Sequence, residues 1–357
     1  MAKKNRTQKQ EANEQRAAAE TQEDKCLVSP VHEARPSRKK APARNKKAIL
    51  VTGAAGVLAQ ETIARLSPKY KIIAVDFRRA VEIGEDIVSY KVDFMKRSLE
   101  DVFRQHDFHA VIHLGRIGTM AHGGFLRYNA NVIGTTKLFD LCVKYGINQV
   151  QVLSSFFVYG ASAYNPALLD EDTPLKASDL TLDLIDSVEL ENLSNIYMYK
   201  YPELHMTILR PCNIAGPGIR NNIGRLLSSR SVPVLWGFNP VMQFIHVKDM
   251  ADAIVLAYEK NSPGVYNVAP EDWIAYQDVL RRCRIRGVPI PSIPPVLPRF
   301  LSRALGWKAF PSYLINYFKY PTIIDGGKFA RTFGFKPQRS LEEIFTHYRE
   351  LKKKAYL

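Results

Sequence analysis

The sequence predicts an α/β fold built on a doubly wound parallel sheet, and the order of its apolar segments is what predicts it. From residue 48 onward, short apolar runs of strand length alternate with longer segments that carry apolar residues at helical spacing. A glycine-rich turn follows the first run, and the second run ends in a carboxylate. Strands that alternate with helices in this way are typical of crossover units, whose neighbouring strands run parallel.

The composition is that of a globular protein large enough to bury a sizeable core. Hydrophobic residues make up 46% of the 357 residues and charged residues 24%. No apolar run approaches the roughly 20 residues that a membrane span requires, so no transmembrane segment is expected. The 4 cysteines and 8 histidines show no metal-ligand spacing, and we therefore predict no metal site and reduced thiols in a cytoplasmic protein.

A basic tail precedes the first apolar run. Residues 1–47 hold 13 Lys and Arg against 6 Asp and Glu and contain no aromatic residue, so they carry +7 of the net charge of +15. Such a segment cannot bury enough apolar surface to fold alone, and we expect it to be disordered. It is interpreted either as a solvated tether or as an arm that binds an acidic protein or another anionic partner.

The predicted elements follow one another regularly in the first part of the chain. Strands are expected over 48–52, 71–76, 110–114, 149–154 and 206–210, with helices over 56–67, 97–105, 129–145 and 188–200 and a short segment at 87–92. The strands are short runs rich in apolar residues, as strands buried on both faces require. Beyond residue 210 the alternation is less regular and predicts a smaller C-terminal α/β domain. Its elements are helices over 222–229, 249–259 and 276–284 and strands over 233–236 and 264–268.

The turn between the first strand and the first helix has the residues that an anion site needs. Gly53 permits a tight turn, Gly56 lets a ligand approach the backbone, and the small Ala59 lets the helix pack on the strand. The free N–H groups at the start of the helix, together with the positive end of its dipole, suit a pyrophosphate. Taken alone, the glycine pattern also describes an ordinary turn between a strand and a helix.

Asp76 strengthens the prediction of a dinucleotide site. It ends the second apolar strand, about 20 residues after the glycine turn, where a Rossmann-type fold places the acid that binds the adenosine ribose. Its charge favours NAD over NADP, whereas the following Arg78 and Arg79 could receive the 2′-phosphate of NADP.

The predicted domains are an NAD(P)-binding domain over 48–210, a small substrate-binding-type domain over 211–345, and a basic helix end over 346–357. Segments of the C-terminal part are expected to return to the NAD(P)-binding domain.

Further motifs follow in the same order and extend the pattern over about residues 48–345. They include Val92-Asp93-Phe94, Val111-Ile112-His113-Leu114-Gly115, Asn131-Val132-x-Gly134-Thr135, Leu153-Ser154-Ser155-x-x-Val158-Tyr159-Gly160, Leu209-Arg210-Pro211-x-Asn213 and Phe244-Ile245-His246-Val247-x-Asp249. With them the chain resembles the extended short-chain dehydrogenases/reductases, in the NAD-dependent epimerase/dehydratase branch. It is most similar to a bacterial UDP-glucose 4-epimerase-like subgroup whose active site is not always complete.

The resemblance implies NAD as the cofactor and a set of residues that hold it. These are Gly53, Ala55, Gly56, Val57, Asp76, Asp93, Phe94, Leu114, Gly115 and Asn131. Asp93 would meet the adenine edge, and Leu114 and Gly115 would place backbone beside the cofactor. For Asp93 and Asn131, a hydrogen bond within a turn or at a helix start is the alternative role.

The catalytic set that the resemblance implies is incomplete in this chain. Such epimerases use a tyrosine to remove a hydroxyl proton, a lysine to lower the pKa of that tyrosine and to hold the nicotinamide ribose, and a serine to orient the substrate. Ser155 matches the serine, but the tyrosine and lysine positions fall on Asp183 and Ser187. An aspartate is about six pKa units more acidic than a tyrosine, and a serine carries no charge that could activate a neighbour.

Two replacements for the missing couple remain open. The tyrosines and the lysine of segment 197–200 lie farther along the same predicted helix, and Asp183 or Asp186 could act as an unconventional base. The literal Tyr-x-x-x-Lys of the chain, at 348–352, lies in the C-terminal helix and is interpreted as a coincidence.

The substrate half also departs from the family pattern. The arginine that usually clamps the nucleotide diphosphate falls on Met242, while Asn213 and Arg220 remain as candidate contacts to a nucleotide sugar. The aromatic segment 300–320 is interpreted as packing of the C-terminal domain, with a cap over the cleft or a membrane contact as alternatives.

Two functions are compatible with this pattern. The first is a non-catalytic NAD-binding scaffold or sensor, because the tyrosine, the lysine and the clamping arginine are all missing while the cofactor motifs persist. The second is an active nucleotide-sugar epimerase or dehydratase with atypical catalytic residues. By analogy with the family, we expect a homodimer formed through the helices over 129–145 and 188–200.

Overall fold

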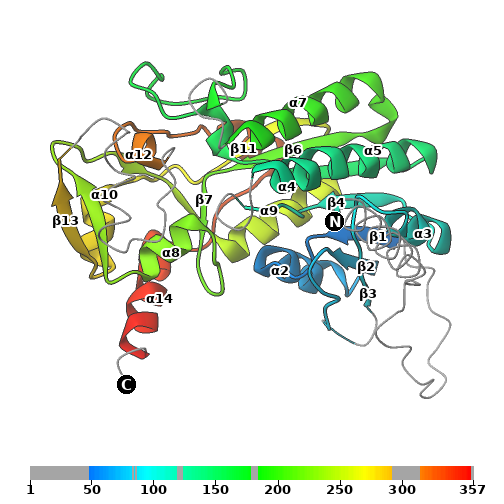
Figure 1. The fold of residues 1–357 in the computed structure, drawn as a ribbon, viewed down its shortest axis with the longest axis horizontal. Coiled ribbons are helices and arrows are strands. Elements are labelled where there is room, and N and C mark those ends of the chain that lie inside the picture. The colour runs from blue at the N-terminus through cyan, green and yellow to red at the C-terminus, as the bar shows by residue number, and fades with distance from the viewer. Residues whose placement is uncertain are drawn as a thin grey trace, which may run out of the picture.

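A seven-stranded parallel sheet lies at the centre of the molecule, with the strand order β11-β6-β5-β4-β1-β2-β3 (Figure 1). Its strands are β1 (Ala48–Thr52), β2 (Lys71–Asp76), β3 (Val88–Lys91), β4 (Ala110–His113), β5 (Gln149–Leu153), β6 (Met206–Pro211) and β11 (Gly264–Val268). The predicted doubly wound sheet of Rossmann type is confirmed. The computed structural model describes residues 48–82, 84, 87–118, 124–177, 184–291 and 314–354, so the tail 1–47, Asp183 and most of the aromatic segment lie outside the described residues.

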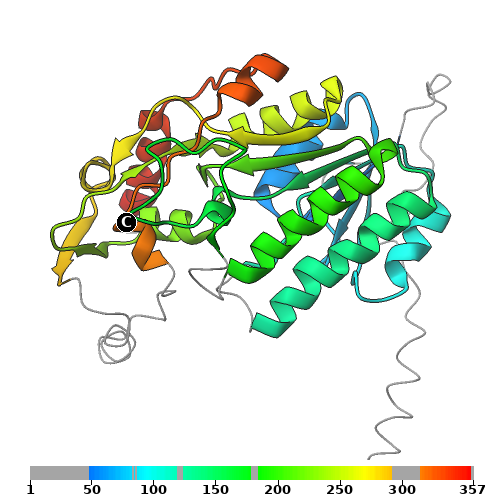
Figure 2. The same cartoon turned by 90° about the horizontal axis from the view of Figure 1, so that it is seen from above.

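Helices cover both faces of this sheet. They are α2 (Val57–Leu66), α3 (Ser98–Gln105), α5 (Gly134–Lys144), α7 (Ile185–Lys200) and α9 (Val247–Lys260). In Figure 2, α5 and α7 lie side by side on one face, and α2 and α9 lie on the other. The residues of β1 alternate accordingly, since Ile49 and Val51 pack in the core that contains α2 and α9, whereas Leu50 packs in the core that contains α3 and α5. Among the described residues, no helix has the length and apolar character to cross a membrane.

Two helices begin earlier than the sequence predicts. The helix expected over 129–145 begins with α4 (Gly124–Tyr128) and passes through a π-helical turn, η1 (Asn129–Ile133), before it continues as α5. The helix expected over 188–200 begins at Ile185 as α7. Its first turn is polar in sequence yet buried, with Asp186 and Ser187 each 1% exposed, so hydrophobic periodicity could not reveal it. Isolated π turns are frequent at functional sites, and this one carries Asn131.

The C-terminal part forms a smaller half beside the sheet (Figure 1). In its described residues it contains three strand pairs: β7 (Asn213–Ala215) with β10 (Phe244–His246), β8 (Ser231–Leu235) with β13 (Arg286–Ile290), and β9 (Val241–Met242) with β12 (Ile274–Ala275). The accompanying helices are α8 (Asn222–Ser228), α10 (Tyr276–Arg282), α12 (Leu314–Tyr317), α13 (Gly327–Phe333) and α14 (Leu341–Lys354). Because β11 and α9 return to the central sheet and its helical layer, the two halves are interwoven in sequence. The division at residue 211 stays a prediction.

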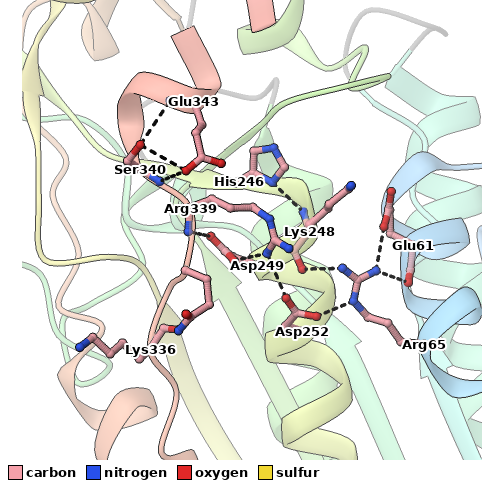
Figure 3. A network of polar contacts seen from close by, with 11 residues as sticks. Glu61, Arg65, His246, Lys248, Asp249, Asp252, Lys336, Arg339, Ser340 and Glu343 are labelled. Carbon is pink, nitrogen blue, oxygen red and sulfur yellow. Dashed lines mark hydrogen bonds and ion pairs between the residues drawn. The ribbon is translucent and has the colours of Figure 1, made fainter. Parts of the chain in front are cut away.

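An ion-pair network fastens the C-terminal segment to the helices of the sheet (Figure 3). Arg339, just before α14, donates hydrogen bonds to Asp249 at the start of α9 and to Asp252 one turn later. Asp252 also accepts from Arg65 of α2, and Arg65 in turn pairs with Glu61 of the same helix. The network therefore joins α2, α9 and the segment before α14.

Candidate functional site

The candidate site lies where the strand order reverses. From β1 the chain proceeds outward through β2 and β3, and it then returns to the other side of β1 with β4, β5 and β6. In open α/β sheets, ligands bind outside the carboxyl ends of the strands at such a switch point. The segments at this position are the glycine turn after β1 and Leu114 and Gly115 after β4.

Gly53 and Gly115 bring these two segments into backbone contact. Gly53 has a φ of 71°, and a Cβ atom on it would lie 2.6 Å from the Cα atom of Gly115. A Cβ atom on Gly115 would lie 3.1 Å from the backbone nitrogen of Gly53. The two turns therefore pack backbone against backbone, and a side chain at Gly53 would overlap Gly115.

The start of α2 has the features of an anion site. Gly56 precedes the helix in an extended conformation, and its N–H donates a 2.8 Å hydrogen bond to the carbonyl of Gly53. The N–H groups of Val57, Leu58 and Ala59 have no acceptor within the helix, and the first helical hydrogen bond runs from Gln60 to the carbonyl of Gly56. The first turn of α2 carries no acidic residue that would repel an anion. A Cβ atom on Gly218 would lie 3.0 Å from a methyl group of Val57, so the loop after β7 leans against this helix end.

Asp76 stands at the carboxyl end of β2 and is only 3% exposed. One carboxylate oxygen accepts the N–H of Ala55 in the glycine turn at 3.0 Å, and the other accepts the N–H of Arg78 at 2.8 Å. The side chain of Arg78 approaches the second oxygen at 3.4 Å. A carboxylate can accept about four hydrogen bonds, so Asp76 braces the turn and keeps capacity for about one further donor.

The other predicted adenosine contacts lie near the same edge of the sheet. Asp93, after β3, accepts the N–H of Met95 at 2.9 Å, which is the turn hydrogen bond considered as its alternative role. Phe94 packs against Gly134, where a Cβ atom would come within 3.1 Å of the Phe94 side chain. Both residues are half-buried, and their contact to a cofactor stays a prediction.

A chain of hydrogen bonds ties the loop after β4 to the π turn. The N–H of Gly115 donates to the hydroxyl of Thr52 at 3.1 Å, and this hydroxyl lies 2.7 Å from Nδ1 of His113. Nε2 of His113 lies 3.0 Å from the hydroxyl of Thr135, which itself donates to the carbonyl of Asn131 at 2.7 Å. The two ends fix the direction, so His113 accepts at Nδ1 and donates from Nε2. Burial lowers the pKa of His113 to about 4, which keeps the imidazole neutral.

Asn131 holds the same loop from the other side. Its side-chain carbonyl accepts the N–H of Ile117 at 2.8 Å, and its amide group donates to the carbonyl of Ile117 at 2.9 Å. The amide group also donates to Asp186 of α7 at 2.6 Å. Asn131 is 2% exposed. In the structure it therefore positions the loop between Gly115 and Ile117, and a direct contact to the cofactor stays a prediction.

Ser187, the residue predicted to stand at the family's lysine position, makes a polar contact with an arginine. Ser187, in the first turn of α7, accepts a hydrogen bond from the guanidinium of Arg116, which lies in the loop after β4. Asp186 pairs with Arg127 of α4 at 3.1 Å, and the two side chains are 1% and 5% exposed. The tyrosine position, Asp183, lies outside the described residues. Sequence reasoning overlooked Arg116 and Arg127, although the place of Arg116 directly after Gly115 was a usable signal.

The segment 197–200 does not bring a tyrosine to the crevice. Tyr197 is 8% exposed, its hydroxyl donates to Asp140 of α5, and burial raises its pKa. Tyr199 is 82% exposed. The pair at 348–352 is likewise engaged elsewhere, with Tyr348 bonded to Gly216 and Lys352 donating to the carbonyl of Cys283.

Ser155 stands at the carboxyl end of β5. This strand is the neighbour of β4, and Arg116 lies in the loop after β4. It begins the short 3₁₀ helix η2 (Phe156–Tyr159), and its hydroxyl accepts the N–H of Phe157 at 3.3 Å. The side chain is half-buried. Its neighbour Ser154 is 5% exposed, and the Ser154 hydroxyl has no hydrogen-bond partner in the described part of the chain.

The predicted substrate contacts lie in the smaller half. The amide of Asn213 donates to the carbonyl of Gln243 at 2.9 Å, and the Gln243 side chain accepts the N–H of Ile324 at 2.9 Å. Met242, at the position of the missing arginine, is half-buried in β9. Arg220 is exposed in the loop before α8. Asn213 is therefore hydrogen-bonded within the smaller half, whereas the Arg220 side chain faces the solvent.

Among the described residues, no group of His, Cys, Asp and Glu side chains could hold a metal ion.

The residues of the crevice fit a dinucleotide. The bare backbone at Gly53 and Gly115 and the open first turn of α2 suit a pyrophosphate, and Asp76 suits the adenosine ribose.

Among proteins of known function, the UDP-glucose 4-epimerase of Bacillus subtilis is 28% identical over 341 residues, which cover 83% of this chain and 94% of that protein. An uncharacterized protein of Mycobacterium tuberculosis is 25% identical over 319 residues, covering 85% and 83% of the two chains.

Solved structures agree with this fold. The Thermus thermophilus UDP-glucose 4-epimerase in complex with NAD superposes with a TM-score of 0.69 at 18% identity, over 86% of this chain and 99% of that one. The sequence model of the NAD dependent epimerase/dehydratase family matches residues 49–269, which include the glycine turn, Asp76, Ser155 and the whole central sheet except its first residue. The chain belongs to the NAD dependent epimerase/dehydratase family.

Proposed function

We propose that this protein binds NAD in the crevice between β1 and β4 and acts as a non-catalytic, NAD-binding scaffold or sensor. The glycine turn and the first turn of α2 would hold the pyrophosphate, and Asp76 would hold the adenosine ribose. NAD, when bound, supplies a nicotinamide ring that can take up a hydride and return it. The chain's own residues have to move the accompanying proton, and here the described part of the crevice offers no suitable group.

The single observation that carries this proposal is the set of contacts that Ser187 and Asp186 make in the first turn of α7. Ser187 accepts a hydrogen bond from Arg116 where the family has a lysine, and a hydroxyl with a pKa far above neutrality cannot replace that charge. Asp186 is neutralised by Arg127 and also bonded to Asn131. A buried carboxylate whose oxygens are already held by a guanidinium and an amide is poorly placed to receive a proton from a substrate hydroxyl.

Calorimetry and a turnover assay test the proposal. We expect NADH to bind to the full chain, and we expect Gly53→Val to abolish this binding because the new side chain would overlap Gly115. A panel of nucleotide sugars should show neither epimerisation nor reduction of bound NAD. In cells, Gly53→Val should abolish function while Ser155→Ala should not. Turnover of any nucleotide sugar by the purified protein would contradict the non-catalytic role.

An active nucleotide-sugar epimerase or dehydratase is the second candidate. Ser155 stands at the carboxyl end of β5 as the family requires, and the similarity to the Bacillus subtilis UDP-glucose 4-epimerase extends over 83% of the chain. Under this function, Asn213 and Arg220 would contact the nucleotide sugar, and an atypical group would move the proton. Conversion of UDP-glucose to UDP-galactose that is lost in Ser155→Ala would support it.

The proposal extends to the assembly and the location of the protein. Apolar side chains are exposed on α7 and on α4, which precedes α5, with Ile196 59%, Phe125 77% and Leu126 62% exposed. A second copy of the chain would cover this face in a homodimer. Cys142, Cys212 and Cys283 are free and buried, which supports a reducing, cytoplasmic environment. The basic tail would recruit an acidic or otherwise anionic partner.

A further inference from the structure

Thr52 and His113 stand side by side at the carboxyl ends of β1 and β4. They are partners in the register of the sheet, and each is the last residue of its strand. The two turns that meet at the crevice follow them directly, with Gly53 after β1 and Gly115 in the loop after β4. Thr52 is 0% and His113 3% exposed, so their hydrogen bonds are shielded from water.

The hydrogen bonds of these two side chains have a defined direction. The hydroxyl of Thr135 donates to the carbonyl of Asn131, so towards His113 it accepts, and Nε2 carries the proton. In the neutral imidazole Nδ1 is then the acceptor, and the hydroxyl proton of Thr52 points to it. The oxygen of Thr52 is left to accept the N–H of Gly115 at 3.1 Å. The imidazole therefore sets the direction in which the Thr52 hydroxyl points.

Packing and burial keep the imidazole of His113 in this state. Its ring centroid lies 6.1 Å from that of Phe94 and 6.4 Å from that of Phe139. Burial lowers the pKa of His113 to about 4, so the ring is neutral near pH 7 and Nδ1 remains an acceptor. A flipped ring would turn a C–H group towards Thr52 and leave that buried hydroxyl without its acceptor, which is unfavourable.

The hydrogen bond from Gly115 to Thr52 adds a polar link to the backbone contact between the two turns. A Cβ atom on Gly53 would lie 2.6 Å from the Cα atom of Gly115, so the turns already touch. Contact between backbones resists compression but not separation, whereas a hydrogen bond resists both. A dinucleotide that lies across the carboxyl ends of β2, β1 and β4 reaches both turns. A spacing that is fixed before the ligand arrives lowers the cost of ordering on binding.

We propose that His113 is a positioning residue for the dinucleotide, which acts through Thr52 to fix the spacing between the turns at Gly53 and Gly115. The proposal rests on the proposed binding of NAD. His113 is buried, and both of its ring nitrogens are bonded within the fold, so it would act without touching the ligand. Its contribution would be measured as cofactor affinity.

Two amide variants of the full chain separate the two hydrogen bonds of His113. In His113→Asn, the side-chain oxygen can replace Nδ1 and accept from Thr52, but the contact with Thr135 is lost. In His113→Gln, the amide nitrogen can replace Nε2 and donate to Thr135, but the contact with Thr52 is lost. We expect His113→Gln to weaken NADH binding about 10-fold in calorimetry and His113→Asn to retain affinity within about threefold of the wild type. Equal NADH affinities in the two variants would overturn the proposal.

Matched threonine variants test the same link from the other side. Thr52→Val keeps the shape but removes the hydroxyl, and it should weaken NADH binding about 10-fold, whereas Thr52→Ser keeps the hydroxyl and should retain most of the affinity. Failure of Thr52→Ser to bind better than Thr52→Val would overturn the proposal.

Thr207→Val is the control for a general loss of stability. Thr207 is also 0% exposed, and its hydroxyl donates to the carbonyl of Ser262 at 3.1 Å near the amino end of β6, away from the crevice. This variant should lower the urea midpoint and leave NADH affinity unchanged. A loss of affinity as large as that in Thr52→Val would mean that destabilisation alone weakens binding, which would overturn the positioning role. If the wild type itself bound no NADH, the proposed function would fail instead.

Discussion

Arg127 of α4 and Asp186 of α7 form an ion pair of 3.1 Å in which both side chains are almost completely withdrawn from water. Asp186 also accepts a hydrogen bond from Asn131, so the pair connects α4, the π turn and the first turn of α7. Two of these segments contact the loop after β4, the π turn through Asn131 and α7 through Ser187. The geometry of the candidate site therefore depends on a charge pair whose partners lie 59 residues apart in the sequence.

We expect Asp186→Asn to lower the free energy of unfolding by about 3–5 kcal/mol, because it removes one partner of a buried ion pair. Urea unfolding followed by circular dichroism measures this change. Replacing both partners with apolar residues, as in Arg127→Met with Asp186→Leu, should cost less than the single change. As a control, Asp101→Asn on the exposed face of α3 should leave the urea midpoint unchanged. An unaltered urea midpoint in Asp186→Asn would show that the ion pair does not stabilise the fold.

Gly53 and Gly146 offer a matched test of the crevice floor. Both have a positive φ, 71° and 64°, but a Cβ atom on Gly53 would overlap Gly115 whereas one on Gly146 would have no heavy atom within 4 Å. We expect Gly146→Ala to cost only the backbone strain of about 1–2 kcal/mol. Gly53→Ala should cost more and should also abolish the binding of NADH, since the overlap pushes the two loops apart. Calorimetry with both variants measures the difference. NADH binding by Gly53→Ala at wild-type affinity would refute the predicted role of the turn.

Local patterns in the sequence predict where the glycine turn and Asp76 lie in the fold, but not the polar contacts at the start of α7. The glycine turn and Asp76 could be predicted because each depends on a short motif at the end of an apolar strand. The contacts of Arg116 with Ser187 and of Arg127 with Asp186 could not, because they join residues that are 71 and 59 positions apart. Charged residues are expected on the surface, so burial of a polar first turn in α7 has no signature in hydrophobic periodicity. The π turn at Asn131 is equally invisible, since one added residue per turn leaves composition unchanged.

The buried imidazole of His113 predicts a loss of stability in acid. Burial lowers its pKa to about 4 in the folded protein, against an unfolded value of about 6.5. Between these values the unfolded chain binds more protons than the folded one, so stability falls as the pH falls from about 6.5 toward 4. By pH 4.5 the contribution of this group amounts to a loss of about 2–3 kcal/mol. Urea unfolding at several pH values should show this slope in the wild type and a smaller slope in His113→Gln. Parallel slopes for the two proteins would mean that His113 does not titrate as its burial predicts.

The exposed apolar face on α7 predicts a homodimer that a single charge can disrupt. Ile196 is 59% exposed and Tyr199 82% exposed, and both would be buried if a second copy packed against α5 and α7. We expect light scattering with size exclusion to give twice the chain mass of 40.5 kDa for the wild type at micromolar concentration. Ile196→Glu should yield the monomer, because it would bury an unpaired carboxylate in the interface. Trp236→Glu, a change of a 76% exposed side chain in the smaller half, should remain dimeric. A monomeric wild type would contradict the predicted homodimer. Dissociation caused by Trp236→Glu but not by Ile196→Glu would indicate an interface in the smaller half.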